Sequence, residues 1–158
     1  MKPSTRHVML AAVMTIVVAG FGGSALAQDT ETVIKNREHL MKGRGKDLGS
    51  VEAYTEGKAD LAKAEAGATG LTQSTKKIPE VFPPGTGATS SDGKYATKPA
   101  IWADWNKFLE AQKTAYDKAE VLLVAVKSGD KTKIEAAFGD LGKNGCGGCH
   151  ETFREKLN

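Results

Sequence analysis

Apolar residues recur at intervals of three and four over four stretches of the chain, a period typical of amphipathic helices. The first helix is expected over residues 30–55, capped by Asp29 or Thr30, with Ile34, Met41 and Leu48 on one face. A second helix is expected over 58–78, ended by the proline at 79. Its seam alternates three and four residues and consists of Leu61, Ala64, Ala68, Leu71, Thr75 and Ile78.

Residues 79–98 contain proline, glycine and serine clusters and are expected to form the one long connection. A third helix is predicted over 98–127, with Thr97 as its cap and Pro99 in its first turn. Asp130 is expected to cap a fourth helix over 131–156. The stripe of the third helix is Ile101, Trp105, Phe108, Gln112, Ala115, Ala119, Leu122 and Val126, and that of the fourth begins with Ile134, Phe138, Leu141 and Gly145.

No stretch alternates apolar and polar residues over the length of a strand. The fold class is therefore expected to be all-α, an antiparallel up-down-up-down four-helix bundle. Bundles of this kind hold ligands with side chains that project from facing helices into the core.

The N-terminus has the pattern of a secretory signal peptide. Lys2 and Arg6 precede an uncharged run over 8–21, and small residues follow at 24–27, so cleavage is expected after Ala27. A retained membrane anchor is the alternative, but the uncharged run over 8–21 is shorter than the roughly 20 apolar residues that a membrane span needs. The chain is then divided into a signal peptide, 1–27, and one domain, 28–158, which we expect in the periplasm.

The formal charge of +3 comes largely from this leader. Without Lys2 and Arg6 the chain has 20 basic and 19 acidic residues, a charge of +1. No basic block is interleaved with aromatic residues, so nucleic acid is not an expected partner. No other apolar run is long enough to span a membrane.

The strongest chemical signal is Cys146-Gly147-Gly148-Cys149-His150, which contains both cysteines of the chain. This pattern indicates covalent haem attachment through two thioethers, with the histidine as an iron ligand. On a helix, residues three and four apart share one face, so both sulfurs and the imidazole can reach one haem. The two glycines are expected to leave room for the flat macrocycle against the backbone.

Other uses of a cysteine pair fit the sequence less well. A zinc site needs further ligands, and no second cysteine pair or histidine cluster supplies them. A thioredoxin-type redox pair is expected after a strand in an alternating β/α pattern, whereas this pair lies at the C-terminal end of a helical chain. Two purely structural cysteines beside a surface histidine are the remaining alternative.

The chain resembles the class II c-type cytochromes, the family of cytochrome c′ and its low-spin relatives. The haem motif lies near the C-terminus, as in that family. The other matching segments are 37–42 (REHLMK), 81–86 (VFPPGT), 100–102 (AIW) and 153–154 (FR). The resemblance covers essentially the whole of 28–158. It implies a four-helix bundle with one covalently bound haem c at one end of the core, and a periplasmic location.

The resemblance also suggests roles for single residues. Cys146 and Cys149 are the attachment points, and His150 is the proximal ligand. Low-spin members ligate the iron with a methionine at the position of Met41, whereas some cytochromes c′ carry a methionine there without an iron bond. The family places an arginine at Arg37 against a haem propionate, and Arg154 follows His150 by one turn.

The residues leave alternatives open for these side chains. Met41 fits the core face of its helix as well as it fits the iron. Arg37 is either a propionate partner or an arginine whose head group reaches solvent, and Arg154 is either a propionate contact or a solvated C-terminal residue. His39 lies about 200° around the helix from Met41 and is not an expected ligand.

Two functions follow. The first is a periplasmic electron carrier with His150/Met41 ligation, which docks transiently with redox partner proteins. The alternative is a five-coordinate binder of small gases such as nitric oxide or carbon monoxide. An enzyme is not expected, because no distal acid or base is identifiable. The protein is expected to be a monomer or a homodimer.

Overall fold

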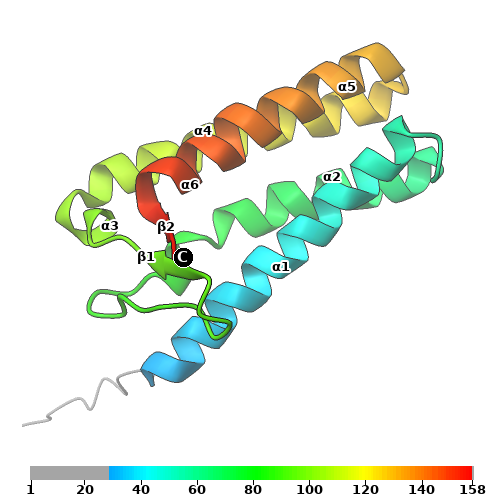
Figure 1. Ribbon diagram of the computed structural model, residues 1–158. Helices are drawn as coiled ribbons and strands as arrows, with labels where there is room; N and C mark the ends of the chain where they lie inside the picture. Colours follow the sequence, from blue (N-terminus) through cyan, green and yellow to red (C-terminus); the bar gives the residue numbers. More distant parts are fainter. Residues whose placement is uncertain (1–28, 158) are drawn as a thin grey trace, which may run out of the picture.

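The computed structural model describes residues 29–157. The predicted signal peptide, 1–27, lies outside the described residues. The described part is an antiparallel four-helix bundle, which confirms the predicted fold class (Figure 1). Its long helices are α1 (Thr30–Thr55), α2 (Leu61–Lys76), α4 (Trp105–Ser128) and a last helix that starts as α5 (Lys131–Asp140).

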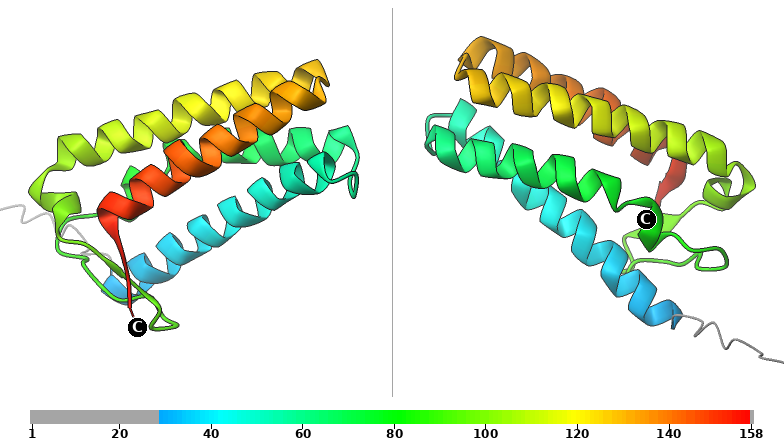
Figure 2. Two further views of the ribbon diagram at one scale, coloured as in Figure 1. Left: turned by 45° about the horizontal axis from the view of Figure 1, so that its top comes forward. Right: turned by 180° about the vertical axis from the view of Figure 1, so that it is seen from behind.

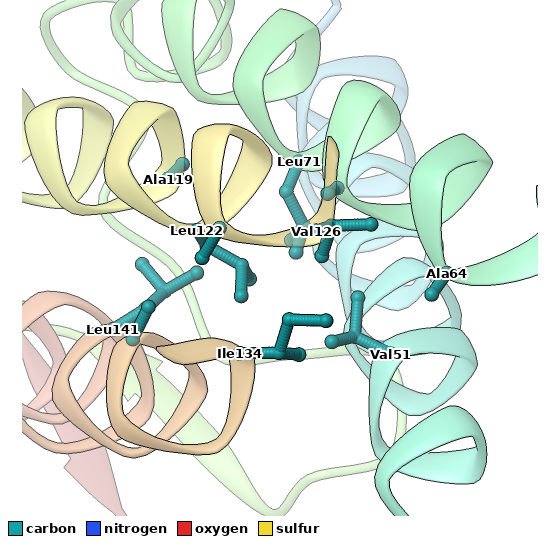
Figure 3. Packing of buried hydrophobic residues seen from close by; sticks show 11 residues of the cluster. Val51, Ala64, Leu71, Ala119, Leu122, Val126, Ile134 and Leu141 are labelled. Atoms are coloured by element: carbon teal, nitrogen blue, oxygen red, sulfur yellow. The ribbon is translucent and has the colours of Figure 1, made fainter. Parts of the chain in front are cut away.

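The core lies where the hairpin of α1 and α2 packs against the hairpin of α4 and α5 (Figure 3). Leu71, Leu122, Ile134 and Leu141 are fully or almost fully buried there. The predicted seam of α2 is confirmed, because all its members except the partly buried Leu61 are buried. Small residues on that seam let the neighbouring helices come close: Ala64 and Ala68 both have 0% of their surface exposed.

The last helix departs from the predicted 131–156. After α5 the chain widens into a π-helical segment, η2 (Leu141–Gly147), and then continues as α6 (Gly148–Phe153). The helix ends at Phe153 because the next residues pair with the long connection instead. Strand β2 (Arg154–Lys156) lies antiparallel to β1 (Tyr95–Thr97), a ribbon that the sequence pattern did not predict.

The predicted third helix is also interrupted. A short helix, α3 (Ala100–Ala103), is separated from α4 by Asp104, whose φ of −139° is not helical. The Asp104 carboxylate accepts a bond from the Lys107 N–H at 3.0 Å and so caps α4. The prediction that Thr97 caps this helix was wrong, because Thr97 belongs to β1. The caps at Asp29 and Asp130 are confirmed.

The two hairpins diverge toward the end of the bundle that holds α3 and the β-ribbon (Figures 1 and 2). The connection enters this end through a short 3-10 turn, η1 (Pro79–Val81). It is then tied to α3 by the Trp102 indole N–H, which donates to the Phe82 carbonyl oxygen at 3.0 Å. Within residues 29–157, no helix is long and apolar enough to cross a membrane.

Gly67 tests the close approach of α1 and α2. A Cβ at Gly67 would collide with the backbone oxygen of Asp47, whereas a Cβ at Gly43 would meet nothing within 4 Å. We expect Gly67→Ala to lower the free energy of unfolding by about 1–3 kcal/mol. Gly43→Ala is the control and should raise it by up to about 1 kcal/mol. Urea titrations of both variants measure this, and equal effects would contradict the packing described.

Candidate functional site

A cavity of about 410 Å³ lies between the diverging hairpins. Its walls come from α1, α2, the long connection, α4 and the last helix. Large apolar side chains, including Leu48, Leu71, Phe82 and Phe108, form much of its surface. This volume lies within the ordinary range for sites that enclose small molecules and cofactors.

Cys146, Cys149 and His150 all line this cavity, as their spacing predicted. All three side chains are partly buried, and neither cysteine is in a disulfide. Gly145 lets this segment approach α4, because a Cβ there would lie 3.4 Å from the Ala115 Cα and 2.9 Å from the Leu141 Cδ1.

The two glycines between the cysteines do not face the cavity, where the sequence analysis expected them to leave room for the macrocycle. Gly147 and Gly148 are exposed and are not among the residues that line the cavity. A Cβ at Gly148 would meet nothing within 4 Å. The structure therefore gives no sign that they make room on the cavity side.

Burial sets the protonation of the motif. It lowers the pKa of His150 to about 4, with further contributions from the positive charges of Arg154 and Arg44. The imidazole is thus neutral at pH 7, the form that binds metal ions. Burial also raises the pKa of the Cys149 thiol.

Met41 lines the same cavity from α1. It is partly buried and packs against the cluster of Ile78, Phe82, Ile101, Phe108 and Phe153, as Cys149 does. It is the one methionine among the described residues. His39, two residues earlier, is exposed and lies outside the cavity lining, as the helical geometry predicted.

Arg37 also lines the cavity, but its guanidinium is bonded to the long connection. Its Nε donates to the Val81 oxygen at 3.0 Å, and its Nη1 to the Thr86 oxygen at 3.2 Å and the Thr97 Oγ1 at 3.0 Å. Its Nη2 donates to the Thr86 Oγ1 at 2.9 Å, and its Cζ lies 4.2 Å from the centre of the Phe82 ring. Arg37 thus anchors the connection, a role that the sequence did not predict, and its propionate role stays a prediction.

Arg154 is the first residue of β2 and is exposed, although it contributes to the cavity wall. Its Cζ lies 4.4 Å from the centre of the Tyr95 ring on the neighbouring strand. This contact holds the arginine beside His150, where its positive charge helps to lower the imidazole pKa.

Two cavity residues were missed by the sequence analysis. Arg44 follows Met41 by three residues on the same face of α1 and is 8% exposed. Glu38 accepts hydrogen bonds from both the N–H and the Oγ of Ser91 and so closes the connection over the edge of the cavity. The helical spacing between Met41 and Arg44 could have indicated that Arg44 faces the cavity. No local pattern could have indicated the contact of Glu38, because its partner Ser91 is 53 residues away.

These residues fit a haem c. Two thiols can form thioethers, while a neutral imidazole and a thioether come from different helices into one cavity. Apolar walls suit the macrocycle, and Arg37 and Arg154 in the cavity wall offer positive charge for its carboxylates. Among the described residues, no cluster of three histidine, cysteine or acidic side chains offers a metal site of another kind.

Comparison with known proteins gives consistent matches. The family model described as Cytochrome C′ matches residues 32–154. Cytochrome c-556 from Agrobacterium tumefaciens (strain II Chrys) is 33% identical over 126 residues, 78% of this chain and 97% of that protein. Cytochrome c′ from Cereibacter sphaeroides is 32% identical over 154 residues, 96% and 99% of the two chains.

A solved structure with the same fold is a nitric oxide complex of a mutant cytochrome c prime from Alcaligenes xylosoxidans. It superposes with a TM-score of 0.70 and 28% identity, over 81% of this chain and 97% of that one.

Glu38 makes the closure of the connection dependent on pH. The bonds from Ser91 lower the pKa of this carboxyl below its usual 4.5. The stabilisation is therefore present above pH 4.5 and is lost as the pH falls through the lowered pKa. We expect Ser91→Ala to lower the free energy of unfolding by about 1 kcal/mol at neutral pH. The difference in Tm between this variant and the wild type should become smaller in acid.

The control is Thr114→Ala, which removes an exposed hydroxyl bonded to the Glu110 backbone oxygen. No carboxylate is involved there, so its small effect should not vary with pH. A Ser91→Ala difference that stays constant from neutral pH into acid would contradict the contact with Glu38.

Proposed function

The chain belongs to the cytochrome c′ family, and we propose that it is an electron carrier with one haem c attached to Cys146 and Cys149 and ligated by His150 and Met41. When bound, the haem supplies an iron that exchanges a single electron between its ferric and ferrous states. In this proposal the protein transforms no substrate.

Met41 is the observation that carries the proposal. It contributes a soft, neutral thioether from α1 to the cavity that His150 enters from α6. Such a ligand stabilises reduced iron and suits an electron carrier. The neutral His150 imidazole supports the same ligation, because its lone pair is available at pH 7.

The proposed setting is the periplasm, after cleavage of the signal peptide at Ala27. Redox proteins would dock transiently near the cavity edge formed by the connection and β2. Among the described residues, His150 is the one histidine that lines the cavity, and the carboxylates of Glu38 and Asp92 line it as well.

A second function has its own supporting observation. The matched Alcaligenes xylosoxidans structure is a nitric oxide complex, and the walls of this cavity are largely apolar. If Met41 only packs in the core, the iron keeps an open position, and these walls would admit a small neutral gas. The two functions therefore differ in one bond.

The decisive variant is Met41→Ala in the haem-loaded protein. We expect the wild type to be low-spin, with a weak ferric sulfur-to-iron charge-transfer band, and the variant to be high-spin without that band. The band can be assigned without ambiguity, because Met41 is the only methionine in 28–158. Optical spectra in both oxidation states measure this.

Leu48→Ala is the matched control, because it shortens another side chain of α1 that lines the same cavity. It should leave the low-spin spectrum unchanged. A high-spin wild type that binds carbon monoxide readily would overturn the Met41 ligation and favour the gas-binding function.

The attachment sites are tested by a Cys146→Ser/Cys149→Ser variant. We expect haem to become extractable with acidified organic solvent and thermal unfolding to become broad, because the core loses its largest apolar group. A single Cys146→Ser variant keeps one thioether and should retain covalent haem. A sharp unfolding transition in the haem-free double variant would show that the bundle does not need the haem.

A further inference from the structure

Arg44 is a buried cation that the proposed function does not use. Only 8% of its surface is exposed, and it lines the same cavity as Met41 and His150. Burial lowers its pKa, but a guanidinium remains charged throughout the neutral range. A positive charge is therefore held inside the cavity wall.

The hydrogen-bond acceptors of this charge are neutral. Arg44 Nη1 donates to the Leu71 backbone oxygen at 3.3 Å, to the Ser74 Oγ at 3.2 Å and to the Thr75 Oγ1. The ion pairs of the described chain do not include Arg44. These bonds hold the guanidinium against α2 but do not cancel its charge. The partly buried Asp47 carboxylate, three residues later on α1, interacts with this charge but forms no ion pair with it.

Arg44 shares its cavity with the haem-attachment motif. It lines the same cavity as Cys146 and Cys149, and the sulfurs of both cysteines contribute to its pKa. A haem attached to these cysteines would therefore have the Arg44 charge in the wall of its cavity.

We propose that Arg44 raises the reduction potential of the haem. Reduction adds one electron, supplied by a reduced partner protein, to ferric iron and lowers the charge of the centre by one. A fixed positive charge nearby disfavours the more positive ferric state, and apolar walls screen this interaction weakly. The inference rests on the proposed haem at this site, but it is independent of whether Met41 binds the iron.

A neutral residue at position 44 should be compatible with folding. The hydroxyls of Ser74 and Thr75 both donate to the Leu71 oxygen, at 3.2 and 2.6 Å, so they keep a partner without the arginine. Replacing a buried charge with a neutral side chain of similar size is often neutral or stabilising. Arg44→Gln is the first choice, because a methionine here could itself bind iron, and Arg44→Leu is the second.

The experiment is a potentiometric titration of the haem-loaded protein, with dithionite as reductant and ferricyanide as oxidant. We expect Arg44→Gln and Arg44→Leu to lower the ferrous-to-ferric ratio at a fixed potential about tenfold, a shift of about 59 mV for one electron. Arg44→Lys keeps the charge and should shift the ratio much less.

Lys46→Gln is the control for charge alone, because Lys46 is an exposed cation on the same helix. This variant should change the ferrous-to-ferric ratio by less than twofold, and the change should disappear at high salt. The effect of the buried Arg44 charge should persist, because salt screens a buried charge less. Thr75→Val controls for the hydrogen bonds. It removes one acceptor of Arg44 but leaves the charge in place, so it should lower stability without lowering the potential tenfold.

Three results would overturn the proposal: neutral variants with an unchanged potential, an Arg44→Lys shift as large as that of Arg44→Gln, or an equal shift in Thr75→Val. Optical spectra recorded on the same samples keep this test separate from the proposed function. A low-spin spectrum with an unchanged potential rejects the role of Arg44 alone, whereas a high-spin wild type rejects the Met41 ligation alone.

Discussion

The anchoring of the long connection by Arg37 is the interaction on which the open end of the bundle depends. Four hydrogen bonds from one buried guanidinium reach Val81, Thr86 and Thr97. Because the acceptors are spread over the connection, one side chain of α1 holds a segment with little regular structure of its own. Strand β1 is thereby placed where β2 can pair with it, and the cavity has a wall on the side where the two hairpins separate.

The last helix meets two structural requirements. It must pack against α4 in the core and still present two sulfurs and an imidazole to a cavity at its end. Leu141 is fully buried in the core, and from there the chain takes the wider π-helical path to Gly147. Such π-helical segments are often found at functional sites. Gly145 keeps this segment close to α4, and the chain leaves the helix at Arg154 to close the ribbon.

Three arginines around one cavity have three different environments. Arg37 is bonded to the connection, Arg154 lies over Tyr95 at the surface, and Arg44 is buried among neutral acceptors of α2. Their positions therefore give the three arginines different roles: Arg37 anchors the connection, Arg154 is a solvent-screened surface charge, and Arg44 is a buried charge. Together the three arginines place positive charge in the walls of a cavity that is otherwise largely apolar.

The sequence by itself determined the helices and the haem motif, because helical periodicity, aspartate caps and the Cys146–His150 spacing are all local patterns. It predicted α1 to the residue and placed Met41 on the cavity face. It did not predict the break at Asp104, the strand at Arg154–Lys156, or the partners of Arg37, Glu38 and Arg44. Asp104 caps α4 through the nearby Lys107 N–H, but the others depend on groups distant in the sequence. Examples are Thr86 for Arg37 and Thr75 for Arg44, which are 49 and 31 residues away. Only the tertiary structure brings such groups together, because the hydrogen bonds of a buried arginine are decided by which backbone and hydroxyl oxygens the packed helices place around it.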